Sequence, residues 1–151
     1  MLQNVWNIDK VNLDRNKNNK LDYILIEGEQ THFDAVRRTN GFLESSQNLP
    51  LNQLTNLSAD WQRNLSSVKF SKLDTCIIQS AEAIICNNDD MALGVYDYYK
   101  QHKRTFNTPR LKLQIRYQGS SFCVCYRKWK LLFNRKRFAI PYFVIFGGIL
   151  I

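Results

Sequence analysis

Short apolar runs alternate with helical patterns between residues 21 and 103, and this order is the strongest constraint on the fold. Strands are predicted over residues 21–27, 51–57 and 82–86, and helices over about residues 34–46, 60–73 and 91–103. Residues 9–20 are polar and are predicted to form a loop, and Asp34 is the expected cap of the first helix. Because the connections are short, the strands should be parallel and joined by right-handed crossovers. The sequence therefore predicts an α/β fold with a parallel sheet and flanking helices.

The charge of the chain divides near residue 103. The net charge of +8 is the sum of −3 over residues 1–102 and +11 over residues 103–151, and the second part contains no Asp or Glu. Such a break is unusual inside one domain. We expect a lead-in segment over 1–10, a lobe over 11–109, and a basic aromatic tail over 110–151. The tail is interpreted as poorly ordered or as the product of a shifted reading frame, a hypothesis that sequencing the locus would test.

Other features of the composition exclude several protein classes. Hydrophobic residues make up 44% of the 151 residues, which indicates a globular chain with room for one ordinary domain. No apolar segment reaches the roughly 18–20 residues of a membrane-spanning helix, and the N-terminus does not resemble a secretory signal. Four cysteines are too few for a disulfide scaffold in a chain of this length.

Oxygen-bearing side chains recur before the first strand at the spacing of an EF-hand-type calcium loop. Positions 1, 3, 5 and 9 of the pattern are Asp14, Asn16, Asn18 and Asp22, and the main-chain carbonyl of Lys20 stands at position 7. Position 6 needs positive φ, which Asn19 tolerates. Position 12 is Leu25, so Glu82, at the amino end of the third strand, is the expected additional ligand. The alternative is an ordinary solvated turn.

Polar and aromatic residues also follow each predicted strand. They are His32, Asp34 and Arg38 after the first strand, Trp61 after the second and Asn88 after the third. Ligands of open α/β sheets bind at the carboxyl ends of the strands. Charged and amide groups suit sugar hydroxyls, and an indole face suits the C–H patch of a pyranose. Each residue also has a structural alternative, namely a helix ion pair, a core aromatic or an N-cap. No activated nucleophile or paired acid and base is visible, so an enzyme is not expected.

Over about residues 4–103 the sequence resembles the periplasmic galactose/glucose-binding proteins of sugar ABC transporters and chemotaxis. The resemblance rests on the calcium loop, on G-E-x-x-H-x-D-A-x-x-R from residue 28, and on N-N-D-x-M-A-x-G from residue 87. It implies part of a type I periplasmic binding protein, in which two Rossmann-like lobes close on a hexose. It assigns sugar contacts to His32, Asp34, Arg38, Trp61 and Asn88. It assigns a structural calcium to Asp14, Asn16, Asn18, Lys20, Asp22 and Glu82.

The resemblance also implies partners and a location. These are galactose or glucose as ligand, calcium as cofactor, transporter membrane subunits and a chemoreceptor as partners, a monomeric state, and the periplasm or cell surface. Asn18 stands where the family often has Asp, and the lower formal charge should weaken calcium binding. Asn19 stands in place of the usual Gly. The family's N-terminal lobe is not matched, and the sequence after Pro109 diverges from that of the family. We therefore expect an internal fragment with an unrelated C-terminal segment and weakened sugar binding, because a single lobe provides about half of the contacts.

Two other functions remain open at the level of the sequence. One is nucleic-acid or anionic-surface binding through the tail, in which basic residues alternate with aromatic ones. Those residues are Arg110, Lys112, Arg116, Arg127, Lys128, Lys130, Arg135, Lys136 and Arg137, with Tyr117, Phe122, Tyr126, Trp129 and Phe133. The other is a metal-buffering domain acting through the loop alone. Salt-sensitive binding of single-stranded DNA and calcium-dependent melting would test them in turn.

Overall fold

The structure, a computed structural model, describes residues 2–102, 124–125 and 142–145. Its helices are α1 (Leu2–Leu13), α2 (Phe33–Ser45), α3 (Arg63–Ser71), α4 (Thr75–Ser80) and α5 (Asp89–Gln101). Its strands are β1 (Leu21–Glu27), β2 (Leu51–Ser58), β3 (Ala83–Cys86), β4 (Val124–Cys125) and β5 (Tyr142–Ile145). In this part of the chain no helix is both long enough and apolar enough to span a bilayer.

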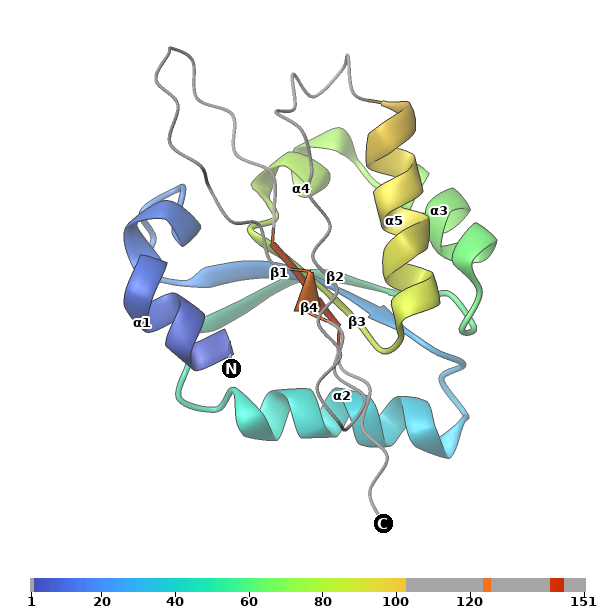
Figure 1. Ribbon diagram of the computed structural model, residues 1–151, viewed down its shortest axis with the longest axis horizontal. Coiled ribbons are helices and arrows are strands. Elements are labelled where there is room, and N and C mark those ends of the chain that lie inside the picture. The colour runs from blue at the N-terminus through green and yellow to red at the C-terminus, as the bar shows by residue number, and fades with distance from the viewer. Residues whose placement is uncertain (1, 103–123, 126–141, 146–151) are drawn as a thin grey trace.

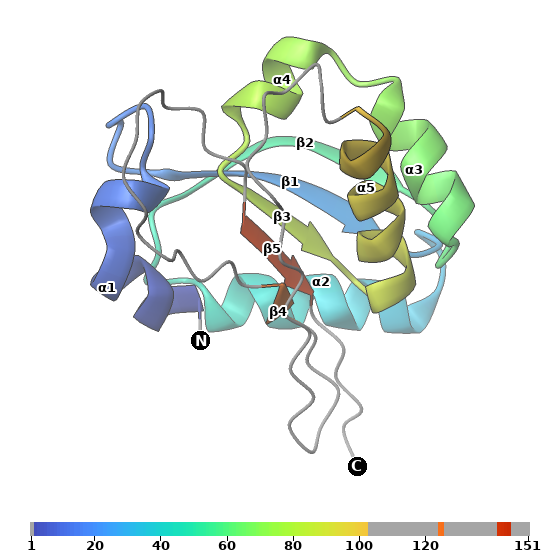
Figure 2. The same cartoon turned by 45° about the horizontal axis from the view of Figure 1, so that its top comes forward.

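The strands form a single sheet in the order β2-β1-β3-β5-β4 (Figures 1 and 2). β1 pairs in parallel with β2 on one side and with β3 on the other, and β5 pairs in parallel with β3. The parallel α/β sheet with flanking helices that the sequence predicts is therefore confirmed. The short β4 pairs antiparallel with β5, and neither of these two strands is predicted by the sequence pattern.

Helices cover both faces of the sheet, with α1 and α2 on one side and α3, α4 and α5 on the other (Figures 1 and 2). Successive β1 side chains point to opposite faces. Ile24 and Ile26 therefore pack under α3, α4 and α5, whereas Tyr23 and Leu25 pack on the side of α1 and α2. Burial on both faces explains why β1 is an almost unbroken apolar run.

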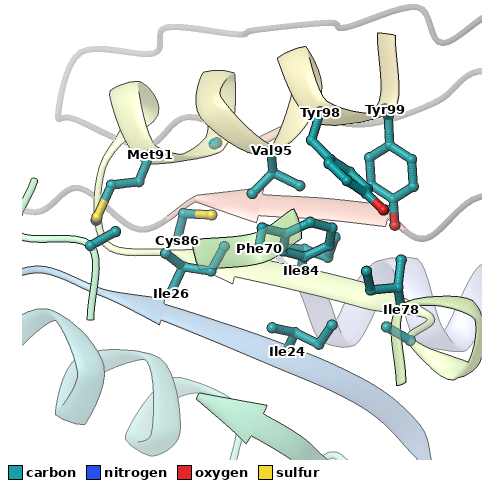
Figure 3. Packing of buried hydrophobic residues seen from close by; sticks show 13 residues of the cluster. Ile24, Ile26, Phe70, Ile78, Ile84, Cys86, Met91, Val95, Tyr98 and Tyr99 are labelled. Atoms are coloured by element: carbon teal, nitrogen blue, oxygen red, sulfur yellow. The ribbon is translucent and has the colours of Figure 1, made fainter. Parts of the chain in front are cut away.

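Each face of the sheet has its own hydrophobic core, and the larger one lies under α3, α4 and α5. This core is rich in aromatic residues where α5 crosses the sheet (Figure 3). Phe70 of α3 makes an edge-to-face contact with Tyr98 of α5, with ring centroids 5.2 Å apart, and lies 5.7 Å from the ring of Tyr99. Burial raises the pKa of the Tyr99 hydroxyl. The buried members are Ile24, Ile26, Ala59, Phe70, Ile78, Ala81, Ile84, Cys86, Met91, Ala92, Val95, Tyr98 and Tyr99.

The contact between α3 and α5 depends on a glycine. A Cβ atom on Gly94 would overlap the main-chain oxygen of Arg63. The Arg63 guanidinium also makes two hydrogen bonds to the Asp97 carboxylate, at 2.7 and 3.0 Å. The two helices are therefore held together by close backbone approach and by a bidentate ion pair at their exposed side.

The prediction of a loop over residues 9–20 is wrong in its first part. Residues 9–13 complete α1, and the helix runs through the predicted boundary between residues 10 and 11. Leu2, Trp6 and Leu13 are buried against the sheet, a spacing that brings them to one side of a helix. The sequence of α1 is otherwise mostly polar, so these few apolar residues do not form a recognisable helical pattern. The helix is stabilised mainly by its packing against the sheet.

Two further predictions about helices are corrected. The pattern over residues 60–73 is a turn followed by α3, and a second helix, α4, begins after its N-cap Asp74, whose carboxylate accepts from the Cys76 N–H at 2.7 Å. α2 is capped by His32 rather than by Asp34, because His32 Nδ1 accepts from the Asp34 N–H at 3.2 Å. An imidazole nitrogen therefore takes the acceptor role that a carboxylate more often plays.

Candidate functional site

The loops that follow β1, β2 and β3 begin side by side at the carboxyl edge of the sheet. The Ala59 N–H donates to the Glu27 carbonyl at 2.8 Å, and the Asn87 N–H donates to the Ile26 carbonyl at 3.0 Å. These bonds extend the parallel ladder one step beyond the strands and align the three loops. The juxtaposition that the sequence predicts at this edge is therefore present.

Trp61 is the centre of this edge. The guanidinium carbon of Arg38 lies 5.4 Å from the centroid of the indole, and the His32 ring meets it edge-on at 5.7 Å. Arg38 is anchored by a hydrogen bond from Nη1 to the Asn87 carbonyl at 2.8 Å, while its buried Nε has no hydrogen-bond partner. A half-buried guanidinium beside an aromatic face is suited to a ligand with hydroxyl groups.

Trp61 lies in a tight turn, not in a helix as the sequence predicts. Asp60 and Trp61 have φ values of 47° and 65°, and the Gln62 N–H donates to the Ala59 carbonyl at 2.8 Å. Positive φ at both central positions with this closing bond defines a type I′ turn. The left-handed region costs an ordinary residue roughly 1–2 kcal/mol, so two adjacent residues here mark a strained segment.

Asn88 and Asp34 complete the predicted set in different ways. Asn88 caps α5, because its Oδ1 accepts from the Met91 N–H at 2.9 Å, and its Nδ2 donates to the Trp61 carbonyl at 3.2 Å. Asn88 is thus an N-cap, which was the structural alternative to a ligand role, and it is also a neighbour of Trp61. Asp34 is exposed on the first turn of α2, beside the His32 ring that caps its N–H. The structure joins His32, Arg38, Trp61 and Asn88 by direct contacts and leaves the Asp34 carboxylate open to solvent.

Asn87 is a residue of this edge that the sequence reasoning missed. It is buried, and its amide donates to the Ala35 carbonyl and to the Thr39 hydroxyl, each at 3.2 Å. Its own carbonyl holds Arg38. Asn87 therefore fixes α2 against the end of β3 and orients Arg38. The sequence reasoning treated Asn87 as part of a polar Asn-Asn-Asp-Asp turn. Its position directly after a buried strand was the signal that could have indicated a buried role.

The loop at the amino edge has the predicted backbone at its sixth position. Asn19 has φ 62°, as the sequence predicts for the position where glycine is usual, and Lys17 has φ 61°. Asp14 Oδ2 accepts from the Asn19 N–H at 2.9 Å, which closes the loop. The Lys20 N–H donates to the Asn18 Oδ1 at 2.7 Å. The loop is thus an ordered turn around the Asp14 carboxylate.

Amide groups surround the second carboxylate of the loop. Asp22 accepts from the Nδ2 atoms of Asn16 at 2.6 Å, Asn18 at 3.2 Å and Asn52 at 2.7 Å. Asp22 is buried, so these three donors replace the water that an exposed carboxylate would bind. Asn52, on β2, is a member of this cluster that the sequence did not indicate.

Glu82 reaches the loop as predicted. It is 1% exposed, and its Oε1 accepts from the Arg15 N–H at 2.5 Å while Oε2 accepts from the Asp22 N–H at 3.1 Å. Burial raises the pKa of its carboxyl group, partly offset by these hydrogen bonds. The Arg15 guanidinium also donates to the Gln79 and Ala81 carbonyls, at 3.0 and 2.5 Å. Arg15, which the sequence reasoning missed, therefore positions the segment that carries Glu82.

The amino-edge residues match the ligand chemistry of a hard cation. All the predicted ligand atoms are oxygens, and Asp14 Oδ1 is buried without a hydrogen-bond partner. In the described residues, no three His, Cys, Asp or Glu side chains form a group that could hold a metal ion. Asn16 and Asn18 turn their amide nitrogens toward Asp22, and coordination would require their oxygens instead.

The predicted tail lies almost wholly outside the described residues. The basic and aromatic residues proposed for nucleic-acid binding, and the predicted boundary at 109/110, all belong to that part of the chain. Cys123 is also outside it. Of the other cysteines, Cys86 is buried in β3 and Cys76 is exposed at the start of α4.

Comparison with known proteins finds a similar sequence and several similar folds. No protein-family model matches the chain. Over 93 residues the chain is 33% identical to the D-galactose/methyl-galactoside binding periplasmic protein MglB of Haemophilus influenzae, a match that covers 60% of this chain and 28% of that protein. The chain thus spans less than a third of the length of this relative.

Solved structures share the fold at lower identity. A galactofuranose binding protein matches with a TM-score of 0.52 and 22% identity over 66% of this chain and 33% of its own. An ABC transporter periplasmic solute binding protein from Actinobacillus succinogenes with bound D-allose matches with a TM-score of 0.50 and 20% identity, over 60% of this chain and 32% of its own. These relatives are binding proteins, not enzymes. The described part of the chain therefore has the fold of a partial type I periplasmic binding protein lobe and resembles in sequence a galactose-binding periplasmic protein.

Proposed function

We propose that this chain forms the sugar-binding lobe of a solute-binding protein of an ABC transporter. The observation that carries the proposal is the meeting of Arg38, His32 and Trp61 at the carboxyl edge of the sheet. That edge is the usual ligand site of open α/β sheets. The similarity to a galactose-binding periplasmic protein supports the same assignment.

The chemistry of the edge suits a hexose, and we propose D-galactose or D-glucose. The indole of Trp61 offers an apolar face for the C–H groups of a pyranose ring. The half-buried Arg38 guanidinium supplies donors beside the indole for a ring or hydroxyl oxygen, and Asp34 has an exposed carboxylate that accepts from hydroxyl groups. His32 and Asn88 border the indole and complete the set of polar neighbours.

We propose a structural calcium at the amino edge. Its ligands would be the side chains of Asp14, Asn16, Asn18, Asp22 and Glu82 and the main-chain carbonyl of Lys20. The proposal is supported by the buried Asp14 Oδ1 and by the positive φ of Asn19. Bound calcium would offset most of the negative charge of the buried Asp14, Asp22 and Glu82 carboxylates and thereby stabilise the fold.

The remaining assignments follow from the similarity. We propose a periplasmic location and interaction with the membrane subunits of a sugar transporter, because the relative in Haemophilus influenzae is a periplasmic protein and a solved neighbour is an ABC transporter solute binding protein. A chemoreceptor is the further partner that the family resemblance suggests.

Titration of the purified chain with D-galactose and D-glucose tests the proposal. Saturable heat in calorimetry and a saturable change in tryptophan fluorescence are expected for at least one of the two sugars. In a Trp61→Phe variant, the fluorescence change should shrink strongly while weaker binding remains measurable by heat. Flat signals in both methods up to millimolar sugar would refute sugar binding by this chain.

A further inference from the structure

We propose that the type I′ turn of residues 59–62 is a strained clamp that fixes the Trp61 indole before any ligand arrives, with Asp60 and Ser58 as its positioning residues. The inference deepens the proposed function, because it rests on Trp61 being the surface on which a sugar ring stacks. It concerns residues that neither the sequence motifs nor the similarity assigns to the site.

The turn carries one residue, Trp61, that does not suit its geometry. A type I′ turn requires positive φ at both central positions and favours Asn, Asp or Gly there. Asp60 is a tolerated residue at φ 47°, but Trp61 at φ 65° is bulky and has no local hydrogen bond of its own side chain to compensate. Such outliers persist where the surrounding structure holds them, and they concentrate at ligand sites.

Contacts from three directions hold the turn. The Ser58 hydroxyl oxygen lies 2.7 Å from Asp60 Oδ1 and 2.9 Å from the Gly28 carbonyl, so it joins the turn to the loop after β1. The Lys69 ammonium donates to the Ser58 carbonyl at 2.7 Å from α3. From the other side, the Asn88 amide donates to the Trp61 carbonyl at 3.2 Å. The backbone on both sides of Asp60 is thereby fixed.

The indole is fixed as well as the backbone. A Cβ atom on Gly28 would overlap the Trp61 ring, so glycine at this position lets the indole lie directly against the β1 loop. Arg38 lies over the ring, and His32 meets it edge-on. A side chain that is already ordered loses little conformational entropy on binding, and this raises affinity without any added contact.

Substitution of Asp60 by glycine separates positioning from stability. Asp60→Gly relieves the strain at φ 47° but removes the Ser58 contact. We therefore expect an unchanged or raised Tm, a lower order parameter for the Trp61 indole N–H in ¹⁵N relaxation, and a sugar Kd raised by about two- to tenfold, the cost of ordering one side chain on binding. Ser58→Ala should lower the order parameter and raise the Kd in the same way. Asp60→Asn should keep the order parameter and the sugar Kd near their wild-type values, because Asn tolerates positive φ and retains an acceptor oxygen.

Ser71→Ala is the matched control for Ser58→Ala. The Ser71 hydroxyl is exposed and bonds within its own helix, to the Val68 carbonyl at 2.8 Å, so neither indole order nor affinity should change. The order parameter is measured without sugar, so failure of the wild type to bind either hexose would refute the proposed function and leave the clamp still tested. An indole that is mobile in the wild type, or equally ordered in Asp60→Gly and Ser58→Ala, would overturn the clamp.

Discussion

The guanidinium of Arg38, on α2, lies over the indole of Trp61, in the turn after β2, with 5.4 Å between its central carbon and the ring centroid. Neither residue is placed there by its own element alone. Arg38 is held by the Asn87 carbonyl at the end of β3, and Trp61 is held by the turn at the end of β2. Three strand ends therefore cooperate in a single contact, which makes this pair the most direct target for mutation.

Arg38→Ala should weaken hexose binding by about 10- to 100-fold, since hydrogen bonds from charged groups contribute roughly 1.5–3 kcal/mol. Arg38→Lys should recover only part of the loss, because an ammonium lacks the planar fork of donors. Calorimetric titration measures the effect. The matched control is Arg37→Ala, one residue earlier on α2, whose guanidinium lies over the exposed Phe33 ring instead. Equal losses for the two variants would contradict the assignment of Arg38 to the site.

Glu82→Gln should abolish calcium-dependent stabilisation. In the wild type, calcium should raise Tm, because a ligand that binds the folded chain stabilises it by mass action. Without the Glu82 carboxylate the loop has no acidic ligand from outside its own sequence, so the shift between chelator and calcium should disappear in thermal melts. Glu44→Gln, which changes an exposed glutamate of α2, should leave the shift intact. A full shift in Glu82→Gln would remove Glu82 from the ligand set.

Glycine-to-alanine substitutions in α5 and α2 should change the free energy of unfolding in opposite directions. Gly94→Ala forces a methyl group into the Arg63 main-chain oxygen, which we expect to cost about 1–3 kcal/mol, as overpacking does elsewhere. Gly41→Ala, in α2, meets no atom within 4 Å and should stabilise the fold by about 0.5–1 kcal/mol through helix propensity. Urea unfolding midpoints at constant slope measure both. A neutral Gly94→Ala would show that α3 and α5 do not pack this closely.

Asp97→Asn should destabilise the chain in a pH-dependent manner. Its hydrogen bonds with Arg63 hold the pKa of the Asp97 carboxyl below its ordinary value. A lowered pKa in the folded state contributes stability above the ordinary carboxyl range, and that contribution is lost as pH falls through the folded pKa. Because the side chains are 46% and 29% exposed, we expect about 0.2–1 kcal/mol at pH 7.

The Asp97 effect should shrink below about pH 4 and at high salt, where the charge is titrated or screened. Denaturant unfolding of the wild type, Asp97→Asn, Arg63→Gln and the double variant gives the coupling energy of the pair directly. A pH-independent difference between wild type and Asp97→Asn would assign the effect to packing instead of charge.

The parallel sheet and its two polar edges were predictable from the sequence, because strands buried on both faces are continuous apolar runs. Once LDYILIE and EAIIC are accepted as neighbouring parallel strands, His32 and Asn88 must follow them at one edge, and Asp22 and Glu82 must lie at the other. The left-handed Asn19 was predictable for a similar reason, since the loop spacing requires positive φ there. The sugar and calcium roles of these residues stay predictions.

Only the tertiary structure decided which side chains meet and what holds them. α1 is not recognisable from its own pattern because the sheet, not the helix itself, stabilises the buried Leu2, Trp6 and Leu13. The turn at Asp60 and Trp61 contradicts the local preference of Trp61, and contacts from the loop after β1, from α3 and from the start of α5 impose it. Asn87 and Arg15 act through main-chain carbonyls of residues 52 to 66 positions away. Local sequence encodes the periodicity of each element, whereas contacts of this kind depend on how the finished elements pack.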